Sequence, residues 1–404
     1  MDATRLTSIE NSGLAVFSEP SEILARQLLP IPDWSKRIPA LDGLRGIAIL
    51  MVLLHHGVFN MKPDSKVLAT LLSVGELTWS GVDLFFVLSG FLIGGILLDV
   101  INSPRYFQTF YIRRAYRIFP LYGVVIGVFF LRHLPLHLVP GALGNVSPMA
   151  IPWYAYVTMT QNWWMAYIGW AGPRALIVTW SLAVEEQFYL TAPFVIRKLR
   201  AAKLIVVLVA IVIGAPLLRQ FLFSRVRDGA FACYILTPCR ADALCLGVLC
   251  ALLVRNSRGW NWLQTQTKTL HWLIGILFAG VIFMTFRHYE QPSHFMVTVG
   301  YSWLALFYAG CLLVIVSGTS NIAQRLLCNS KLMWLGTLAY CTYLIHLPFN
   351  EAFRRLFSMH SGIVSPNIWL AGGVAGSIVA ILVASISWRI FEKPLLQRGH
   401  LHQY

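Results

Sequence analysis

Two ionisable residues stand eleven positions apart in the first long apolar stretch of the chain. Arg45 ends the sequence Leu-Asp-Gly-Leu-Arg, and His56 closes the apolar run that follows it. In a helix, eleven residues exceed three full turns by only ~20°, so the two side chains share one face about 16 Å apart. Ionisable side chains within a membrane span are costly and usually line a cavity or a reaction path. A histidine there is suited to general-base catalysis, because its ordinary pKa is near neutrality.

A simpler interpretation of the same pair stays open. Arg45 would then snorkel at the cytoplasmic end of the helix, and His56 would pack within the protein or at the interface. His55 lies ~80° away from this face and need not share it. Taken alone, these residues favour neither interpretation.

Two adjacent carboxylates, Glu185 and Glu186, lie near the start of another apolar segment. Neighbouring helical residues point ~100° apart, so both cannot face one cavity equally, and one of them is expected to be solvated. Counted along the helices, His56 is ~8 Å and Glu185 ~9 Å from the outer edge of a hydrocarbon core ~30 Å thick. A carboxylate beside an imidazole fixes its tautomer, so a Glu185–His56 partnership is one hypothesis. The sequence does not show whether the two helices adjoin.

Further polar residues lie within or beside the apolar segments. Gly90, which follows Ser89, allows close backbone approach, either for helix packing, which we favour, or for a ligand. Arg240 and Asp242 open another segment, where they are either a pair at the surface or contacts for a substrate. The candidate substrate-binding residues are Asp83, Trp180, Arg240, Asp242 and His346.

The segment from about 134 to 178 is rich in aromatic residues, including Trp153, Tyr154, Trp163 and Tyr167. Such residues are normal for an interfacial belt, which is the safer interpretation. They also suit a platform on which a sugar ring stacks.

A basic cluster comprises Arg113, Arg114 and Arg117. Residues three and four apart project together from a helix. Guanidinium groups suit phosphates, and they equally suit anchoring at the cytoplasmic face of a membrane.

The elements that must position these groups are membrane-spanning helices. Hydrophobic residues make up 57% of the 404 residues and charged residues 12%, and the mean hydropathy is +0.65. A soluble domain has about twice that fraction of charged residues. The composition therefore predicts an all-α polytopic membrane protein with about ten spans. We expect these at about 41–60, 81–98, 118–133, 179–196, 204–222, 237–254, 270–286, 296–317, 334–353 and 368–388.

The distribution of basic residues predicts the topology. With the N-terminus inside, the cytoplasmic segments hold about twice as many Lys and Arg residues as the outer segments. Both termini are therefore expected in the cytoplasm, and the net charge of +15 needs no nucleic-acid partner. We expect a cytoplasmic N-terminal tail over residues 1–37, a transmembrane domain over 38–396 and a cytoplasmic C-terminal tail over 397–404.

Seven separated motifs, taken in order, resemble those of the membrane-bound acyltransferase 3 family. The resemblance extends from about Pro39 to Pro394. The motifs are the Arg45–His56 spacing, Asp83–Ile93 (DxFFVLSGFLI), Arg113–Pro120 (RRxxRIxP), Ser181–Leu190 (SLxxExQFYL), Arg240–Gly247 (RxDxLxxG), Tyr343–Pro348 (YLxHxP) and Phe391–Pro394 (FEKP).

The resemblance implies transfer of an acyl group, often acetyl, from acyl-CoA to a hydroxyl of a glycan, a lipid-linked sugar or a small acceptor. It implies that His56 is the catalytic base, that Arg45 supports the site or the donor, and that Glu185 is a candidate partner. Glu186 falls where the family pattern varies and ranks lower. The candidates for binding the acyl-CoA are Arg113, Arg114, Arg117, Ser89 and Gly90.

No metal and no tightly bound cofactor are expected, and acyl-CoA is expected as a substrate. The expected location is the bacterial cytoplasmic membrane. The rival hypothesis is a proton-coupled transporter, since such carriers also place Arg, Glu, His and Asp within the membrane. Against it, the sequence contains no two-fold repeat and no pair of broken helices.

Overall fold

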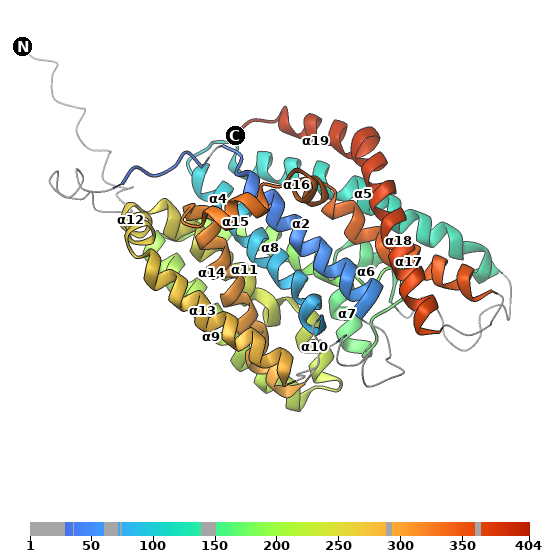
Figure 1. The fold of residues 1–404 in the computed structure, drawn as a ribbon. Helices are drawn as coiled ribbons and strands as arrows, with labels where there is room; N and C mark the ends of the chain where they lie inside the picture. The colour runs from blue at the N-terminus through green and yellow to red at the C-terminus, as the bar shows by residue number, and fades with distance from the viewer. Residues whose placement is uncertain are drawn as a thin grey trace, which may run out of the picture.

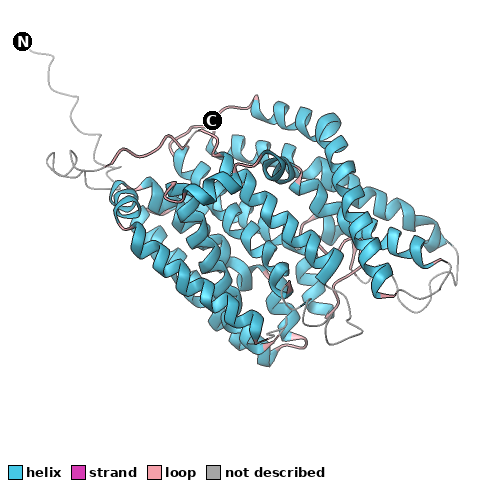
Figure 2. Ribbon diagram, in the orientation of Figure 1, coloured by secondary structure: helices cyan, strands magenta, loops and turns pink. Residues whose placement is uncertain are grey.

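The computed structural model is a bundle of helices with no strand among the residues it describes (Figure 2). Those residues are 29–34, 36–59, 72, 75–138, 151–287, 293–359 and 365–404, and for residues 133–138 only the backbone is described. The all-α prediction is confirmed. Most of the predicted N-terminal tail, residues 1–28, lies outside the described part.

Within the described part, eight helical segments are long and apolar enough to cross a membrane. They are Pro39–Phe59 (α2, η1), Glu76–Asp99 (η2, α4), Tyr106–Arg132 (within α5, Tyr106–Leu138), Ala201–Arg225 (α9), Gly229–Arg255 (α10, α11), Thr267–Phe286 (α13), Met296–Ser317 (η3, α14) and Pro366–His400 (α18, η4, α19). The shorter helices include α6 (Trp153–Val157), α7 (Gln161–Ile168), α12 (Ser257–Thr265) and α15 (Asn321–Leu327).

The two remaining predicted spans also correspond to helices, but neither is a single straight helix of uninterrupted apolar sequence. The helix α8 (Thr179–Lys198) has the length of a span but carries Glu185, Glu186, Arg197 and Lys198, which keep it outside the eight. The predicted span 334–353 is a bent pair, α16 (Ser330–Thr337) and α17 (Ala339–Ser358), with 74° between the two parts.

The first span changes its helical form where it carries the two neighbouring histidines. The helix α2 (Pro39–Leu54) begins with a proline. Proline is favourable there, because an N–H group in the first turn has no hydrogen-bond partner within the helix. It continues into a single π-helical turn, η1 (His55–Phe59). The carbonyl oxygen of His56 accepts a hydrogen bond of 2.7 Å from Arg354 Nη2 in α17. Such π-turns occur frequently at functional sites.

Contacts at helix ends show that the chain crosses the bundle in alternating directions. Arg255, at the end of α11 (Thr237–Arg255), donates two hydrogen bonds of 2.7 Å to Asp99, at the end of α4 (Gly81–Asp99). Its guanidinium also lies 5.4 Å over the ring of Trp34, which precedes α2. Entry to α2 and exit from α4 and α11 therefore lie on one side, as the predicted alternation requires. The helix α19 (Lys393–His400) lies against α5 at the C-terminal end of the chain (Figure 1).

Glycines allow the central helices to touch backbone to backbone. A Cβ atom on Gly90 of α4 would lie 2.0 Å from the carbonyl oxygen of Leu244 in α11, and one on Gly247 would lie 2.2 Å from that of Val87. Without a hydrophobic force between helices in lipid, such close packing is a main source of association. Gly90 is thus part of a helix contact, as we favoured, and it does not line the cavity described below.

We predict that Gly247→Ala destabilises the protein by about 1–3 kcal/mol, because the added methyl group overpacks the α4–α11 contact. Thermal unfolding in detergent measures the change. Gly123→Ala on α5, where a Cβ atom meets nothing within 4 Å, is the matched control and should leave the unfolding temperature unchanged or higher. An equal loss in both variants would contradict this account of the contact.

Candidate active site

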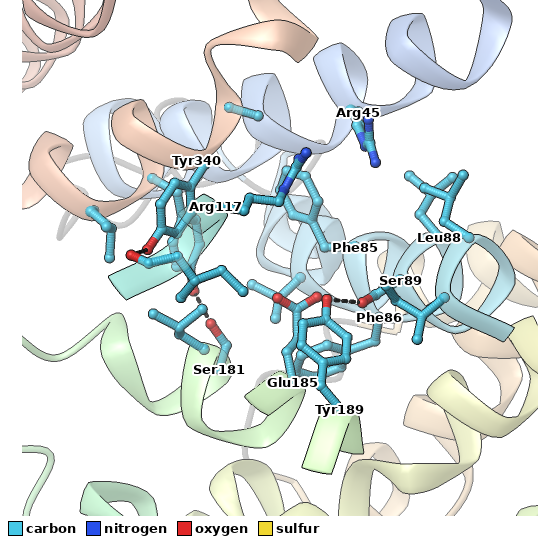
Figure 3. A pocket seen from close by; sticks show the side chains of 18 of the residues that line it. Arg45, Phe85, Phe86, Leu88, Ser89, Arg117, Ser181, Glu185, Tyr189 and Tyr340 are labelled. Carbon is cyan, nitrogen blue, oxygen red and sulfur yellow. Dashed lines mark hydrogen bonds between the residues drawn. The ribbon is translucent and has the colours of Figure 1, made fainter. Parts of the chain in front are cut away.

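A cavity lies among α2, α4, α5, α8, α16 and α17, and it gathers many of the predicted site residues (Figure 3). Its lining on α4 runs from Val82 to Ile93, which lie eleven positions and ~16 Å apart along the helix. Its polar lining consists of Arg45, Ser89, Arg114, Arg117, Ser181, Glu185, Tyr189, Thr337, Tyr340 and Tyr343. The cavity therefore extends along much of the depth of the bundle.

Opposite charges face each other across this cavity. Arg45 and Arg117 approach it from α2 and α5, and Glu185 rises from α8 on the other side (Figure 3). Asp42 holds Arg45 from one turn earlier, at 3.2 Å between Arg45 Nη1 and Asp42 Oδ1. The sequence prediction that Arg45 lines a cavity is thus supported, and Glu185 is placed with the arginine.

The hydroxyl groups of Ser89 and Tyr189 are 2.5 Å apart beside Glu185. They join α4 to α8 and fix the polar floor of the cavity. Glu186 does not line the cavity, and its Oε1 atom is buried without a hydrogen bond. Only one of the two adjacent carboxylates therefore lines the cavity, as the angular argument requires, and it is Glu185, which the family resemblance ranked first. The expectation that the other carboxylate is solvated is wrong, because Glu186 is half-buried.

The three clustered arginines divide into two groups. Arg114 and Arg117, three residues apart, both line the cavity. Arg113 instead donates a hydrogen bond of 2.9 Å to the carbonyl oxygen of His402, and its guanidinium lies 4.8 Å over the ring of Tyr404. Arg113 thus secures the C-terminal tail and does not reach the cavity.

His56 has a histidine as its close partner. Its Nδ1 atom lies 3.2 Å from Nε2 of His346, and the two ring centres are 5.0 Å apart. His346 is completely buried, whereas His56 is half-buried. No hydrogen bond or ion pair joins Glu185 to His56, although both are described residues at similar predicted depth. The hypothesis of a direct Glu185–His56 partnership therefore finds no support in this geometry.

Neither histidine lines the cavity, and Tyr343 connects the two regions. Its side chain lines the cavity, and its ring centre is 6.0 Å from that of His346, which follows one turn later on α17. The Tyr343 hydroxyl lies 2.5 Å from Ser181 Oγ and donates to the carbonyl oxygen of Val178 at 3.2 Å. The tyrosine ring thus lies at the end of the cavity nearest the histidine pair.

Comparison with known families settles the relationship that the motifs indicated. The sequence profile of the family described as an acyltransferase domain matches residues 38–389. The chain belongs to this acyltransferase family.

The curated relatives of this chain have related descriptions. The chain is 29% identical over 384 residues to the peptidoglycan O-acetyltransferase OatA of Listeria monocytogenes, covering 91% of this chain and 57% of the relative. It is 29% identical over 378 residues to the putative peptidoglycan O-acetyltransferase YrhL of Bacillus subtilis, covering 90% and 55%. A putative O-acetyltransferase of Staphylococcus aureus (strain COL) is 27% identical over 374 residues, covering 90% and 58%. The chain thus spans little more than half the length of these relatives.

No solved structure matches the chain significantly.

Three of the predicted substrate-binding residues lie instead in buried ion pairs. Arg240 donates to Asp83, joining α11 to α4. Asp242 accepts from Arg219 of α9 at 3.0 Å and from Ser302 of α14 (Tyr301–Ser317) at 2.6 Å. All four charged residues are at most 2% exposed and none lines the cavity. Because the charges are paired, they offset much of the high free energy of an isolated charge in the membrane. Because the four side chains are buried, a substrate cannot reach them in this structure.

Trp180 is likewise buried and packs on other rings. Its ring centre is 4.6 Å from that of Tyr234 and 6.1 Å from that of Phe86. Of the outer aromatic segment, Trp153, Tyr154, Trp163 and Tyr167 are exposed, as either a belt or a stacking surface requires.

Several residues that shape the site were not singled out from the sequence. Tyr189 and Tyr343 line the cavity, and Arg354 holds the backbone at His56. Gln187 accepts from Thr237 at 2.5 Å and donates to Asn162 Oδ1 at 2.9 Å, which ties α8 to the outer segment and to α11. Three of these residues, Gln187, Tyr189 and Tyr343, lie in the sequence motifs around Glu185 and His346. Their place in those motifs is the signal by which the sequence could have identified them.

We predict that Arg240→Leu and Asp83→Leu each destabilise the protein by about 3–5 kcal/mol, since each leaves one charge buried without its partner. The double substitution should recover much of the loss, because it removes both charges. Thermal unfolding of the three variants in detergent measures the coupling. If the residues instead bind substrate, the single variants would keep wild-type stability and show only a raised KM for the acceptor.

Proposed function

We propose that this acyltransferase moves an acyl group, acetyl being the expected one, from acyl-CoA to a hydroxyl of a cell-surface carbohydrate. The observation that carries the proposal is the cavity, which leads from Arg114 and Arg117 to Tyr343, beside the His56–His346 pair. The printed descriptions of the relatives, peptidoglycan O-acetyltransferases among them, support a carbohydrate acceptor.

The donor enters the cavity from the cytoplasmic side in this proposal. Arg114 and Arg117 bind the phosphates of acyl-CoA, for which forked guanidinium donors are well suited. The pantetheine arm then follows the cavity past Arg45, which Asp42 keeps in place. Tyr343 and Phe85, whose ring centres are 6.3 Å apart, lie at the far end, and the thioester must pass them to reach His56.

The reaction at His56 is a general-base acyl transfer. Nε2 of His56 takes the proton of the acceptor hydroxyl, and the oxygen attacks the thioester carbonyl carbon. The new C–O bond forms, the C–S bond breaks, and the proton passes to the sulfur of the leaving CoA. Because His56 is half-buried, it remains within reach of an acceptor. We place the enzyme in the bacterial cytoplasmic membrane, where acyl-CoA and surface precursors lie on opposite sides.

The transporter hypothesis accounts less well for these features. The chain belongs to an acyltransferase family. In addition, the ion pairs Arg219–Asp242 and Arg240–Asp83 are buried in the core and do not line the described cavity, whereas a carrier would need such groups along its transport path.

We predict that His56→Ala lowers kcat by about 10²–10⁴-fold, the usual contribution of a general base. Transfer of radiolabelled acetyl from acetyl-CoA to a glycan acceptor in proteoliposomes measures it, with acetyl-CoA binding retained. His271→Ala, at an exposed position on α13, is the matched control. Full activity of His56→Ala would remove the base assignment.

We predict that Arg114→Gln and Arg117→Gln each raise the KM and Kd for acetyl-CoA about tenfold or more, because each removes a charge-assisted contact to phosphate. Arg113→Gln is the matched control, since Arg113 belongs to the same cluster but points to the C-terminal tail. Equilibrium binding of a non-hydrolysable acetyl-CoA analogue separates the cases. Equal weakening in all three variants would favour a diffuse electrostatic effect over a specific phosphate site.

A further inference from the structure

The position of the proton on His346 follows from its surroundings. Nδ1 of His346 lies 2.8 Å from the carbonyl oxygen of Tyr343 and 3.2 Å from that of Thr342. Carbonyl oxygens only accept hydrogen bonds, so Nδ1 carries the hydrogen. In the neutral ring, Nε2 is then a bare acceptor, and it faces His56.

The proton position on His56 follows in turn. Its Nδ1 atom lies 3.2 Å from the bare Nε2 of His346 and 3.1 Å from the carbonyl oxygen of Val52. Both neighbours accept, so a bare Nδ1 would face two lone pairs with no proton between them. Nδ1 of His56 therefore carries the hydrogen, and Nε2 is left free to accept a proton.

We propose that His346 is a positioning residue that locks His56 into the tautomer whose Nε2 atom is the base. This proposal rests on the proposed function, because it gives His346 its role through His56. The orienting group in a serine-protease triad is a carboxylate that holds the histidine in the same way. Here a neutral imidazole takes that place, and the sequence interpretation of His346 as a substrate contact is replaced.

The lock is held at more than one point. Arg354, eight residues after His346 on α17, donates to the His56 carbonyl oxygen, and its guanidinium lies 3.4 Å over the ring of Trp369. On the other side, the ring of His55 is 4.9 Å from that of His56. Among the described residues no carboxylate hydrogen-bonds to either ring of the pair. Within the described part of the chain, the acceptors at Nδ1 of His56 are thus both neutral, namely the carbonyl oxygen of Val52 and Nε2 of His346.

With the tautomer of His56 fixed in this way, the path of the proton from the acceptor hydroxyl to the leaving CoA is also defined. The hydroxyl proton of the acceptor moves to Nε2 of His56, and the Nδ1 proton stays shared with His346 and Val52. When the C–S bond breaks, Nε2 returns its proton to the thiolate of CoA. His346 neither gains nor loses a proton over the cycle, so no further acid or base is needed.

Two substitutions at one position test the proposal. His346→Leu removes the acceptor for His56 Nδ1, whereas His346→Gln offers an amide oxygen near the place of the imidazole Nε2. We expect His346→Leu to lower kcat about 100-fold or more, because His56 then populates the wrong tautomer. The KM for acetyl-CoA should stay within about twofold, since His346 does not line the cavity. His346→Gln should recover kcat to within about tenfold of wild type.

The outcomes separate this proposal from the function on which it rests. A double variant, His56→Ala with His346→Leu, should lose no more activity than His56→Ala alone, because the two residues act as a unit. If His56→Ala is inactive but His346→Leu is fully active, the lock is wrong and the base assignment stands. If His56→Ala is fully active, the proposed function itself fails. Equal loss in His346→Leu and His346→Gln with lowered unfolding temperatures would overturn the lock in favour of a packing role.

Discussion

A charged side chain inside an apolar slab must be paired or must face a polar space, and this constraint organises the whole protein. The chain uses both solutions in separate places. Arg219 with Asp242, and Arg240 with Asp83, neutralise one another within the core and tie α4, α9, α11 and α14 together. Arg45 and Glu185 instead face a cavity. The same residue types therefore hold the bundle together in one region and furnish a site in the other.

Much of this arrangement could be read from the sequence, because hydropathy and helical geometry are local properties. All ten predicted apolar segments are helical where the structure describes them, and only one of Glu185 and Glu186 lines the cavity, as the 100° angle between them requires. The depth of a residue along its helix, however, does not tell in which direction its side chain points or which other helices lie beside it. Glu185 and His56 are matched in predicted depth without any contact, and the partner of His56 is a residue 290 positions away.

The roles of the buried polar residues were the least accessible part. A sequence cannot distinguish Arg240 in an ion pair from Arg114 on a cavity wall, because only the folded bundle determines which neighbours each one meets. The same limit applies to Arg113, one position from Arg114 and directed to the C-terminal tail. It applies also to the bend between α16 and α17, since Leu338 is an ordinary helix-forming residue.

That 74° bend has a mechanical consequence. His346 and Arg354 hold the ring and the backbone of His56 from one helix, with about 12 Å between them along its axis. Tyr343 is on the same helix but is tied to α8 through Ser181 and Val178. A swing of α17 about Leu338 would therefore separate His346 and Arg354 from His56 on η1 and Tyr343 from its partners on α8. The angle of the bend and the orientation of His56 are thus set by the same contacts.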